Sequence, residues 1–219
     1  MTGSTAGARA PLSRERAVMV AVGLADAGGI ASLTMRKLAA ELGVEAMSLY
    51  HHVANKDDIL DAMVDFVFSE IELPSLTAPW RAAMRARAFS AREVLLAHPW
   101  AIGLMDSRAT PGQATLRHHD AVLGCLRTSG FEIAMAAHAI SLLDSYVHGF
   151  VLQEISLPFD ASSSLDAEAT EMLAQMDTAA FPYLMEIATE HVLQPGYSYA
   201  DEFPFGLELI LDGLERLAR

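Results

Sequence analysis

The most regular pattern of apolar and polar positions lies in the first third of the chain. Over residues 35–42 the apolar side chains recur at i, i+3, i+4 and i+7, which predicts a helix with one apolar face. Gly43 follows as a residue that can end this helix with a positive φ. In the next segment, 45–52, Leu49 forms an inward pair with Val53, the residue that follows the segment. The polar side chains of the segment therefore face outward. Two short helices joined by a tight turn are typical of a helix-turn-helix DNA-binding segment.

Capping residues divide the flanking sequence into further helices. Ser13 is a suitable N-cap for a first helix, which the paired glycines at 28 and 29 end. Thr34 is placed to cap the second helix. Asn55 is placed to cap a fourth helix, and the aspartates in its first turn complement the helix dipole.

Beyond residue 80 the pattern predicts one helix after another. We expect helices over 80–97, 100–106, 113–128, 131–154, 166–175, 178–193 and 203–218. Pro74 and Pro79 bound a break, which we interpret as the domain boundary. The predicted fold class is all-α. Its parts are a disordered arm (1–12), a three-helix helix-turn-helix DNA-binding domain (13–73), and a second helical domain (74–219).

The stretch 131–154 is the most hydrophobic in the chain and approaches the length of a membrane span. It contains His138, Asp144 and His148, however, and ionisable side chains are costly inside a bilayer. We therefore predict a helix buried on most sides of a helical bundle, and no association with a membrane.

Composition narrows the class of protein. Of the 219 residues 52% are hydrophobic, which is sufficient for a folded globular core. The single cysteine, Cys125, cannot form an intramolecular disulfide, and the first residues lack the apolar core of a signal peptide. A cytoplasmic location is predicted.

The net charge of −13 argues at first against nucleic acid, because DNA-binding surfaces are usually basic. The charge is unevenly distributed, however. Residues 1–56 contain six basic and four acidic side chains, a net charge of +2, which leaves −15 for the remainder. Such a distribution favours binding of DNA by the N-terminal end and keeps the acidic body away from it.

The run Leu49-Tyr50-His51-His52-Val53-Ala54-Asn55-Lys56 is specific, and residues 13–66 resemble the TetR family of transcriptional repressors throughout. The segment 205–217 is similar to the C-terminal dimerisation helix of the branch that contains the tetracycline repressor. The resemblance implies a homodimer that binds double-stranded DNA at a palindromic operator, with 74–219 as the regulatory domain for ligand binding and dimerisation. We expect the helices 131–154 and 203–218 to form the dimer surface, as a four-helix bundle.

The resemblance also implies the DNA contacts. The family's positions fall on Thr34, Arg36, Ala46, Met47, Ser48, Tyr50, His52 and Lys56. Arg36 can make a bidentate contact to a guanine edge, and Lys56 can pair with phosphate at a helix start. Ala46 and Met47 stand where tetracycline repressors have Gln-Pro, so we expect a different operator, contacted through thymine methyl groups.

The effector should also differ from that of the tetracycline branch. Leu104 and Gln153 stand where that branch has a metal-linked histidine and a carboxylate, so no magnesium or other cofactor is expected. A small apolar or amphipathic effector is predicted instead. The candidate pocket residues are Trp100, Leu104, Met105, Arg108, His148 and Phe150.

Other combinations of side chains allow more than one interpretation. Asp144 and His148, at i and i+4, could form a metal or proton-relay pair, or a hydrogen-bonded pair in the bundle. For His118 and His119 a solvated helix surface is favoured over a metal site, and for Cys125 a buried thiol over a nucleophile. No catalytic residue is assigned. The main prediction is a ligand-released repressor; the alternatives are an activator, a ligand-independent regulator, or a small helical enzyme using Asp144 and His148.

Overall fold

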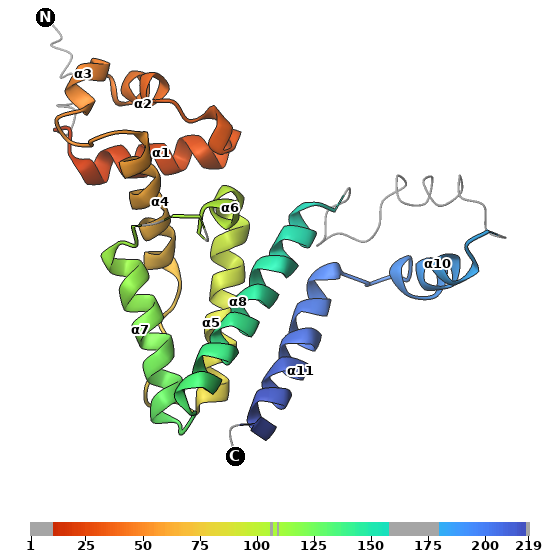
Figure 1. The fold of residues 1–219 in the computed structure, drawn as a ribbon. Helices are drawn as coiled ribbons and strands as arrows, with labels where there is room; N and C mark the ends of the chain where they lie inside the picture. Colours follow the sequence, from red (N-terminus) through yellow and green to blue (C-terminus); the bar gives the residue numbers. More distant parts are fainter. Residues whose placement is uncertain (1–10, 106, 109, 158–179, 218–219) are drawn as a thin grey trace, which may run out of the picture. The chain divides into compact units, whose positions relative to one another are not determined.

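The computed structural model describes residues 11–105, 107–108, 110–157 and 180–217, which are helical wherever they have regular secondary structure (Figure 1). The predicted all-α fold is confirmed for these ranges. All but the last two residues of the predicted arm, and the whole predicted helix over 166–175, lie outside them.

The chain divides into two compact units. One extends to Ile71 and includes Ala97–His118; the other comprises Glu72–Leu96 and His119–Arg219. The segment 97–118 thus packs with the N-terminal helices, although it follows them only after a long interval of sequence. The domain limit proposed at residues 73 and 74 stays a prediction.

The first unit is built from short helices. They are α1 (Arg14–Gly28), the 3₁₀ turn Ile30–Ser32, α2 (Met35–Leu42), α3 (Ala46–Leu49), α4 (Lys56–Glu70), the 3₁₀ turn Pro99–Ala101, α6 (Ile102–Met105) and the start of α7 (Gln113–Thr128). The predicted N-caps are confirmed. The Ser13 hydroxyl accepts a hydrogen bond from Arg16 N (3.2 Å), and Thr34 accepts one from Lys37 N (3.1 Å). Asn55 Oδ1 accepts one from Asp58 N (2.8 Å).

The core of the first unit lies where α1 packs against α2 and α4. Its fully buried side chains include Ala17, Ala21, Leu38, Leu42, Leu49, Ile59 and Met63. Because α1 contributes mainly alanine and valine here, the neighbouring helices approach it closely. The helix-turn-helix therefore rests on α1, and α4 packs against the same helix.

The second unit contains the longer helices. They are α5 (Trp80–Ala97), the remainder of α7, α8 (Ile133–Ile155), α10 (Pro182–Ile187), the π-helical turn Ala188–Val192, the 3₁₀ turn Tyr199–Asp201 and α11 (Glu202–Leu217). The predicted continuous helix over 178–193 is wrong in its bounds. Among the described residues it begins at Pro182, which is favoured in a first helical turn, and it changes to π-helical geometry after Ile187.

Ion pairs and aromatic contacts join α5, α8 and α11. Arg92 on α5 pairs with the buried Glu154 on α8, and Arg81 Nη2 lies 2.6 Å from Glu208 on α11. The hydroxyl of Tyr146 on α8 donates a hydrogen bond to Phe203 O on α11 (2.9 Å). These contacts fix the three helices in one register.

Helix α8 is not buried on most sides in the single chain. One face is buried around Ala139, Leu143 and Val147, whereas Ile133 and Leu152 are exposed. No helix within the described ranges combines the length and apolar character needed to span a membrane.

Candidate nucleic-acid interface and its surroundings

The turn between α2 and α3 depends on Gly43. This residue has φ 70° and ψ 36°, the left-handed conformation that side chains with a Cβ rarely adopt. Its N–H bonds Ala40 O (3.1 Å) and the next N–H, of Val44, bonds Ala39 O (3.0 Å), so the last carbonyls of α2 are satisfied. The chain can then reverse within a few residues and pack α3 against α2.

Helix α3 is a single turn, shorter than the predicted segment 45–52. Glu45 at its start makes no side-chain capping bond, and only Leu49 and Val53 of this region are buried. Beyond Leu49 the chain continues as a series of turns, with His52 N bonding Leu49 O (3.0 Å). Tyr50 and His52 therefore follow the helix and do not lie within it.

The eight predicted DNA-contact residues lie on α2, α3, the turns after α3 and the start of α4. Met47 is 74% exposed and Tyr50 is 45% exposed. The remainder are exposed except for Ala46, which is half-buried: Thr34, Arg36, Ser48, His52 and Lys56. The hydroxyl of Thr34 is already used as the α2 cap.

The exposed surface of α2 is basic and slightly hollowed. A concavity there is lined by Thr34, Arg36, Lys37 and Ala40. Two cationic side chains beside a helix N-terminus attract an anion such as a phosphate group. Sequence reasoning did not include Lys37, although its charge at a position next to Arg36 was visible in the sequence.

Asp58 fixes the far end of the helix-turn-helix. Its Oδ2 accepts a hydrogen bond from Ala54 N (2.9 Å), and its Oδ1 pairs with Arg14 at the start of α1. Partial burial alone would raise the pKa of Asp58, but the Ala54 N–H and the Arg14 guanidinium hold that pKa below its usual range. The carboxylate thus joins the turn before α4 to the first turn of α1.

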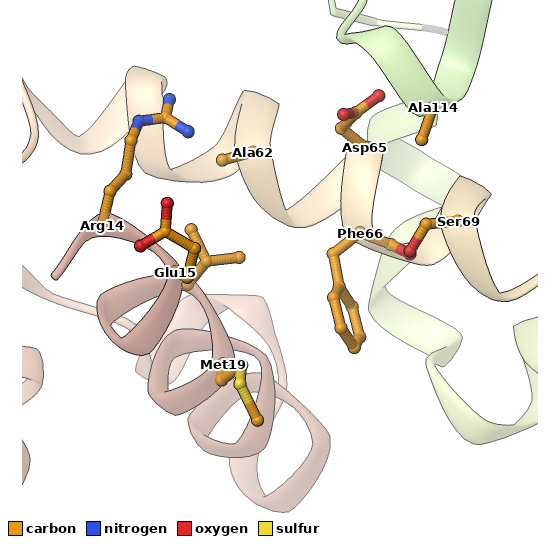
Figure 2. A pocket seen from close by; sticks show the side chains of 9 residues that line it. Arg14, Glu15, Met19, Ala62, Asp65, Phe66, Ser69 and Ala114 are labelled. Atoms are coloured by element: carbon orange, nitrogen blue, oxygen red, sulfur yellow. The ribbon is translucent and has the colours of Figure 1, made fainter. Parts of the chain in front are cut away.

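A pocket of about 380 Å³ lies between α1 and α4 (Figure 2). Its walls are mainly apolar, and charged groups lie at its edges. The lining residues are Arg14, Glu15, Val18, Met19, Ala62, Asp65, Phe66, Ser69 and Ala114. Asp65 is held by Thr115, whose N (2.8 Å) and Oγ1 (2.9 Å) both donate to it. Sequence reasoning missed this pocket because its residues come from three helices.

The predicted effector residues are divided between the two units. Trp100, Leu104, Met105 and Arg108 belong to the first, and His148 and Phe150 to the second. Trp100 is buried, and its indole Nε1 donates to Asp26 (2.6 Å). Phe150 is also buried and stacks on Tyr199 with ring centroids 5.0 Å apart.

Arg108 has carboxylate partners on α4. It pairs with Asp61 and, at 3.3 Å, with Asp57. The Asp61 carboxylate contributes most to raising the pKa of Arg108 above its usual value. In this structure the guanidinium therefore links the segment after α6 to the start of α4.

The other candidate residues, Asp144, His118 and Cys125, have different surroundings. Asp144 Oδ1 lies 2.6 Å from Nη1 of Arg87 on α5, which gives this carboxylate a cationic partner. The expectation of a solvated surface is wrong for His118: this side chain is fully buried, because its ring packs against that of Phe68 on α4. Cys125 is buried, as expected, and burial raises the pKa of its thiol. No cluster of three or more potential metal ligands occurs among the residues that the structure describes.

Comparison with known proteins identifies two family models along the chain. Residues 18–63 match the model described as bacterial regulatory proteins, tetR family. Residues 73–218 match the model described as tetracyclin repressor-like, C-terminal domain. Together they cover most of the chain.

Individual relatives match over nearly the whole length. The HTH-type transcriptional repressor DrrR1 of Streptomyces coeruleorubidus is 34% identical over 96% of this chain and 80% of its own. The class C tetracycline repressor protein of Escherichia coli is 29% identical over 94% of this chain and 92% of its own. The crystal structure of the TetR family protein ActR of Streptomyces coelicolor in complex with actinorhodin has a TM-score of 0.76. It is 30% identical and covers 95% of this chain and 99% of that one.

Proposed function

The chain belongs to the tetR family of bacterial regulatory proteins, and we propose that it is a dimeric repressor which a small-molecule effector releases from its operator. The observation that carries the proposal is the helix-turn-helix. Arg36, Met47 and Tyr50 are exposed above a core closed by Leu49 and Val53. A helix-turn-helix places its second helix in the major groove with the N-terminal residues against the base edges.

The contact residues have different roles in this proposal. Arg36 is the side chain suited to a bidentate contact with guanine. Tyr50, His52 and Lys56 have O–H and N–H donors, which suit phosphate oxygens and would fix the position of α3 without identifying the sequence. Ala46 and Met47, at the start of α3, offer apolar contact to thymine methyl groups.

Two copies of α3 are needed because one turn of helix offers few base contacts. Apolar side chains are exposed on α8 and on α11, with Leu152 on the first and Phe205 and Leu209 on the second. A homodimer through these helices would bury them in a four-helix bundle. The operator is then expected to be palindromic, with half-sites about 34 Å apart or a multiple of that distance.

The effector proposed is small and apolar or amphipathic, bound in the C-terminal part of the chain. Trp100, Leu104, Met105 and Arg108 of the first unit are candidate contacts, and so, as a separate set, are His148 and Phe150 of the second unit. The complex of ActR with actinorhodin supports a ligand of this kind in a related protein. Magnesium is not expected, because Leu104 and Gln153 replace the groups linked to metal, and Gln153 Oε1 accepts a hydrogen bond from Tyr199 (2.6 Å). A catalytic role is not proposed, and action on DNA would require a cytoplasmic location.

Operator binding tests the DNA contacts. The DNA flanking the gene would be screened by fluorescence anisotropy, and the bound fragment titrated with the double variant Arg36→Ala, Tyr50→Ala. We expect the affinity to fall at least about tenfold, since a good bidentate base contact contributes about 1–3 kcal/mol. The variant Arg117→Ala, which removes an exposed arginine on α7, is the matched control and should bind as the parent does. Intact binding by the double variant would refute the assigned contacts.

The regulatory alternatives differ in the cell. Deleting the gene should raise transcription from the bound promoter if the protein is a repressor, and lower it if the protein is an activator. Adding candidate effectors to the operator complex separates a ligand-released repressor from a ligand-independent regulator. A complex whose affinity no tested ligand changes would favour the latter.

A further inference from the structure

A buried histidine of the first unit lies between two carboxylates from different helices. His98 Nδ1 is 2.7 Å from Asp26 Oδ1, near the end of α1, and His98 Nε2 is 2.8 Å from Glu70 Oε2, at the end of α4. The histidine itself is only 8% exposed. One ring therefore links two helices that do not follow each other in the chain.

The two distances favour a positively charged ring. A neutral imidazole has one N–H donor and one acceptor nitrogen, so one of the carboxylates would face a lone pair at hydrogen-bond distance. An imidazolium donates from both nitrogens and matches both acceptors. Asp26 also receives the indole N–H of Trp100 (2.6 Å). The side chain of Glu70 is 40% exposed.

The titratable groups facing the ring come from each element packed around it. They are Asp26 from α1 and Glu70 from α4, and Trp100 and Phe66 supply the aromatic contacts, with Phe66 edge-on at 6.2 Å. Burial by itself lowers the pKa of His98, but the hydrogen bonds to Asp26 and Glu70 outweigh it and raise the pKa above the ordinary value of 6.5. His98 thus loses its charge at a higher pH than an ordinary histidine does.

We propose that protonated His98 is a proton-dependent latch between α1 and α4, which holds the helix-turn-helix in its DNA-binding arrangement. Loss of this proton as the pH rises releases the latch and weakens operator binding. The consequence for operator binding rests on the function proposed above. α1 is the helix on which α2 packs, so a change where α1 meets α4 alters the support of the helix-turn-helix.

The latch differs from a second polar contact between these helices, the pair of Arg14 and Asp58. Arg14 and Asp58 join their N-terminal ends, but an arginine keeps its charge and the pKa of Asp58 is lowered, so this pair does not titrate near neutrality. His98 is the group whose partners on both helices depend on a proton in that range. Losing the proton would free the C-terminal end of α1 from α4 while the N-terminal ends stay paired.

The first experiment is an operator titration between pH 6.0 and 8.5 at constant ionic strength, for the parent and for His98→Gln. A pKa difference of one unit between latched and unlatched states corresponds to about a tenfold change in the equilibrium. We expect the parent to lose affinity by about that factor for each protomer, and His98→Gln to bind weakly with a much flatter profile. The difference between the two profiles is the quantity measured, because it removes pH effects that the parent and the variant share.

Glu70→Gln is a second variant, which keeps the test decisive if His98→Gln fails to fold. It removes one exposed carboxylate and leaves the histidine in place. Its profile should keep the parent's shape with a midpoint at lower pH. His191→Gln is the matched control: this exposed histidine has one carboxylate, Glu202, at 3.2 Å, and lies in the other unit. Its profile should follow that of the parent.

NMR titration of the His98 ring protons provides a readout that needs no DNA. A midpoint above 6.5 that falls in Glu70→Gln is expected; a midpoint at or below 6.5 would overturn the latch. Identical pH profiles for the parent and His98→Gln would overturn it too. If no DNA fragment is bound at any pH while the ring titrates as expected, the proposed function fails and the proton-dependent contact between α1 and α4 stands.

Discussion

At the scale of single residues, one carboxylate organises the junction between α1, the turn after α3 and α4. Asp58 receives the backbone N–H of Ala54, pairs with Arg14, and lies in the helix turn that Asn55 caps. The arrangement works as a capping box, since the cap and the third helical residue each bond a backbone N–H near the other. The start of α4 is therefore fixed by local and distant contacts at once.

Replacing Asp58 by alanine is expected to lower the free energy of unfolding by about 1–2 kcal/mol, the usual effect of losing a helix cap. The pKa of Asp58 is lowered in the folded state, so its contribution is present above the unfolded value of 3.8 and is lost as the pH falls through the folded pKa. Urea unfolding at pH 7 and at pH 3 measures both effects. The difference between parent and variant should shrink in acid.

Asp120→Ala is the control for that experiment, because Asp120 is an exposed aspartate on α7. It should leave the free energy of unfolding within about 0.5 kcal/mol of the parent, as surface substitutions usually do. Equal losses in the two variants would show that the contacts of Asp58 do not matter.

At the scale of elements, the turn between α2 and α3 requires a residue with a positive φ, as the glycine in the sequence suggested. Gly43 has φ 70°, whereas Gly23 lies within α1, where an added Cβ would meet no other segment within 4 Å. The same substitution should therefore have opposite effects at the two positions. Gly43→Ala is expected to destabilise the protein by about 1 kcal/mol or more, and Gly23→Ala to stabilise it by about 0.5–1 kcal/mol.

Thermal unfolding followed by circular dichroism measures the pair. Opposite shifts of Tm are expected, and operator binding should weaken only in Gly43→Ala. A rise in Tm for both variants would mean that the left-handed turn is not required. The comparison is matched because both glycines lie in the first unit and each substitution adds one methyl group.

The helices themselves were largely predictable. Side-chain caps at Ser13, Thr34 and Asn55 are local signals, and the structure confirms each of them. The length of α3 was not predictable in the same way. Its segment has no capping bond and only two buried side chains, so the decision between helix and turn depends on packing against α2.

Contacts between distant segments were beyond the sequence pattern. His98 is separated by 72 residues from Asp26 and by 28 from Glu70, and no periodicity links them. The burial of His118 was missed for a related reason. Periodicity shows that adjacent helical residues face different ways, but not which of them meets Phe68. The division of the candidate effector residues between two units also depends on where residues 97–118 pack.

At the scale of the whole molecule, exposed apolar side chains on the two proposed dimer helices are the main feature. On α11, Leu209 is 58% exposed, and on α8 Leu142 and Leu152 are exposed too. Arg81 meanwhile binds Glu208 and Asp212 of α11, so one side of that helix is committed to contacts within its own chain. A second copy would cover the apolar side.

Leu209→Glu is expected to convert the dimer into a monomer, because the substitution would place a charge in an apolar contact. Sedimentation equilibrium measures the mass, and operator affinity should fall with the loss of the second α3. Leu116→Glu, at a similarly exposed leucine on α7, is the control and should leave the mass unchanged. A variant at position 209 that stays dimeric would move the interface elsewhere.

The single turn of α3 has a consequence for how such a chain diverges after gene duplication. In the segment from Ala46 to Val53 the buried side chains are Leu49 and Val53, whereas Met47, Ser48 and Tyr50 are exposed. Substitutions at the exposed positions are expected to be nearly neutral for folding and, on the proposed contacts, to change the bases that are contacted. A duplicate copy can thus acquire a separate target promoter in few mutational steps, and the intermediate variants stay folded.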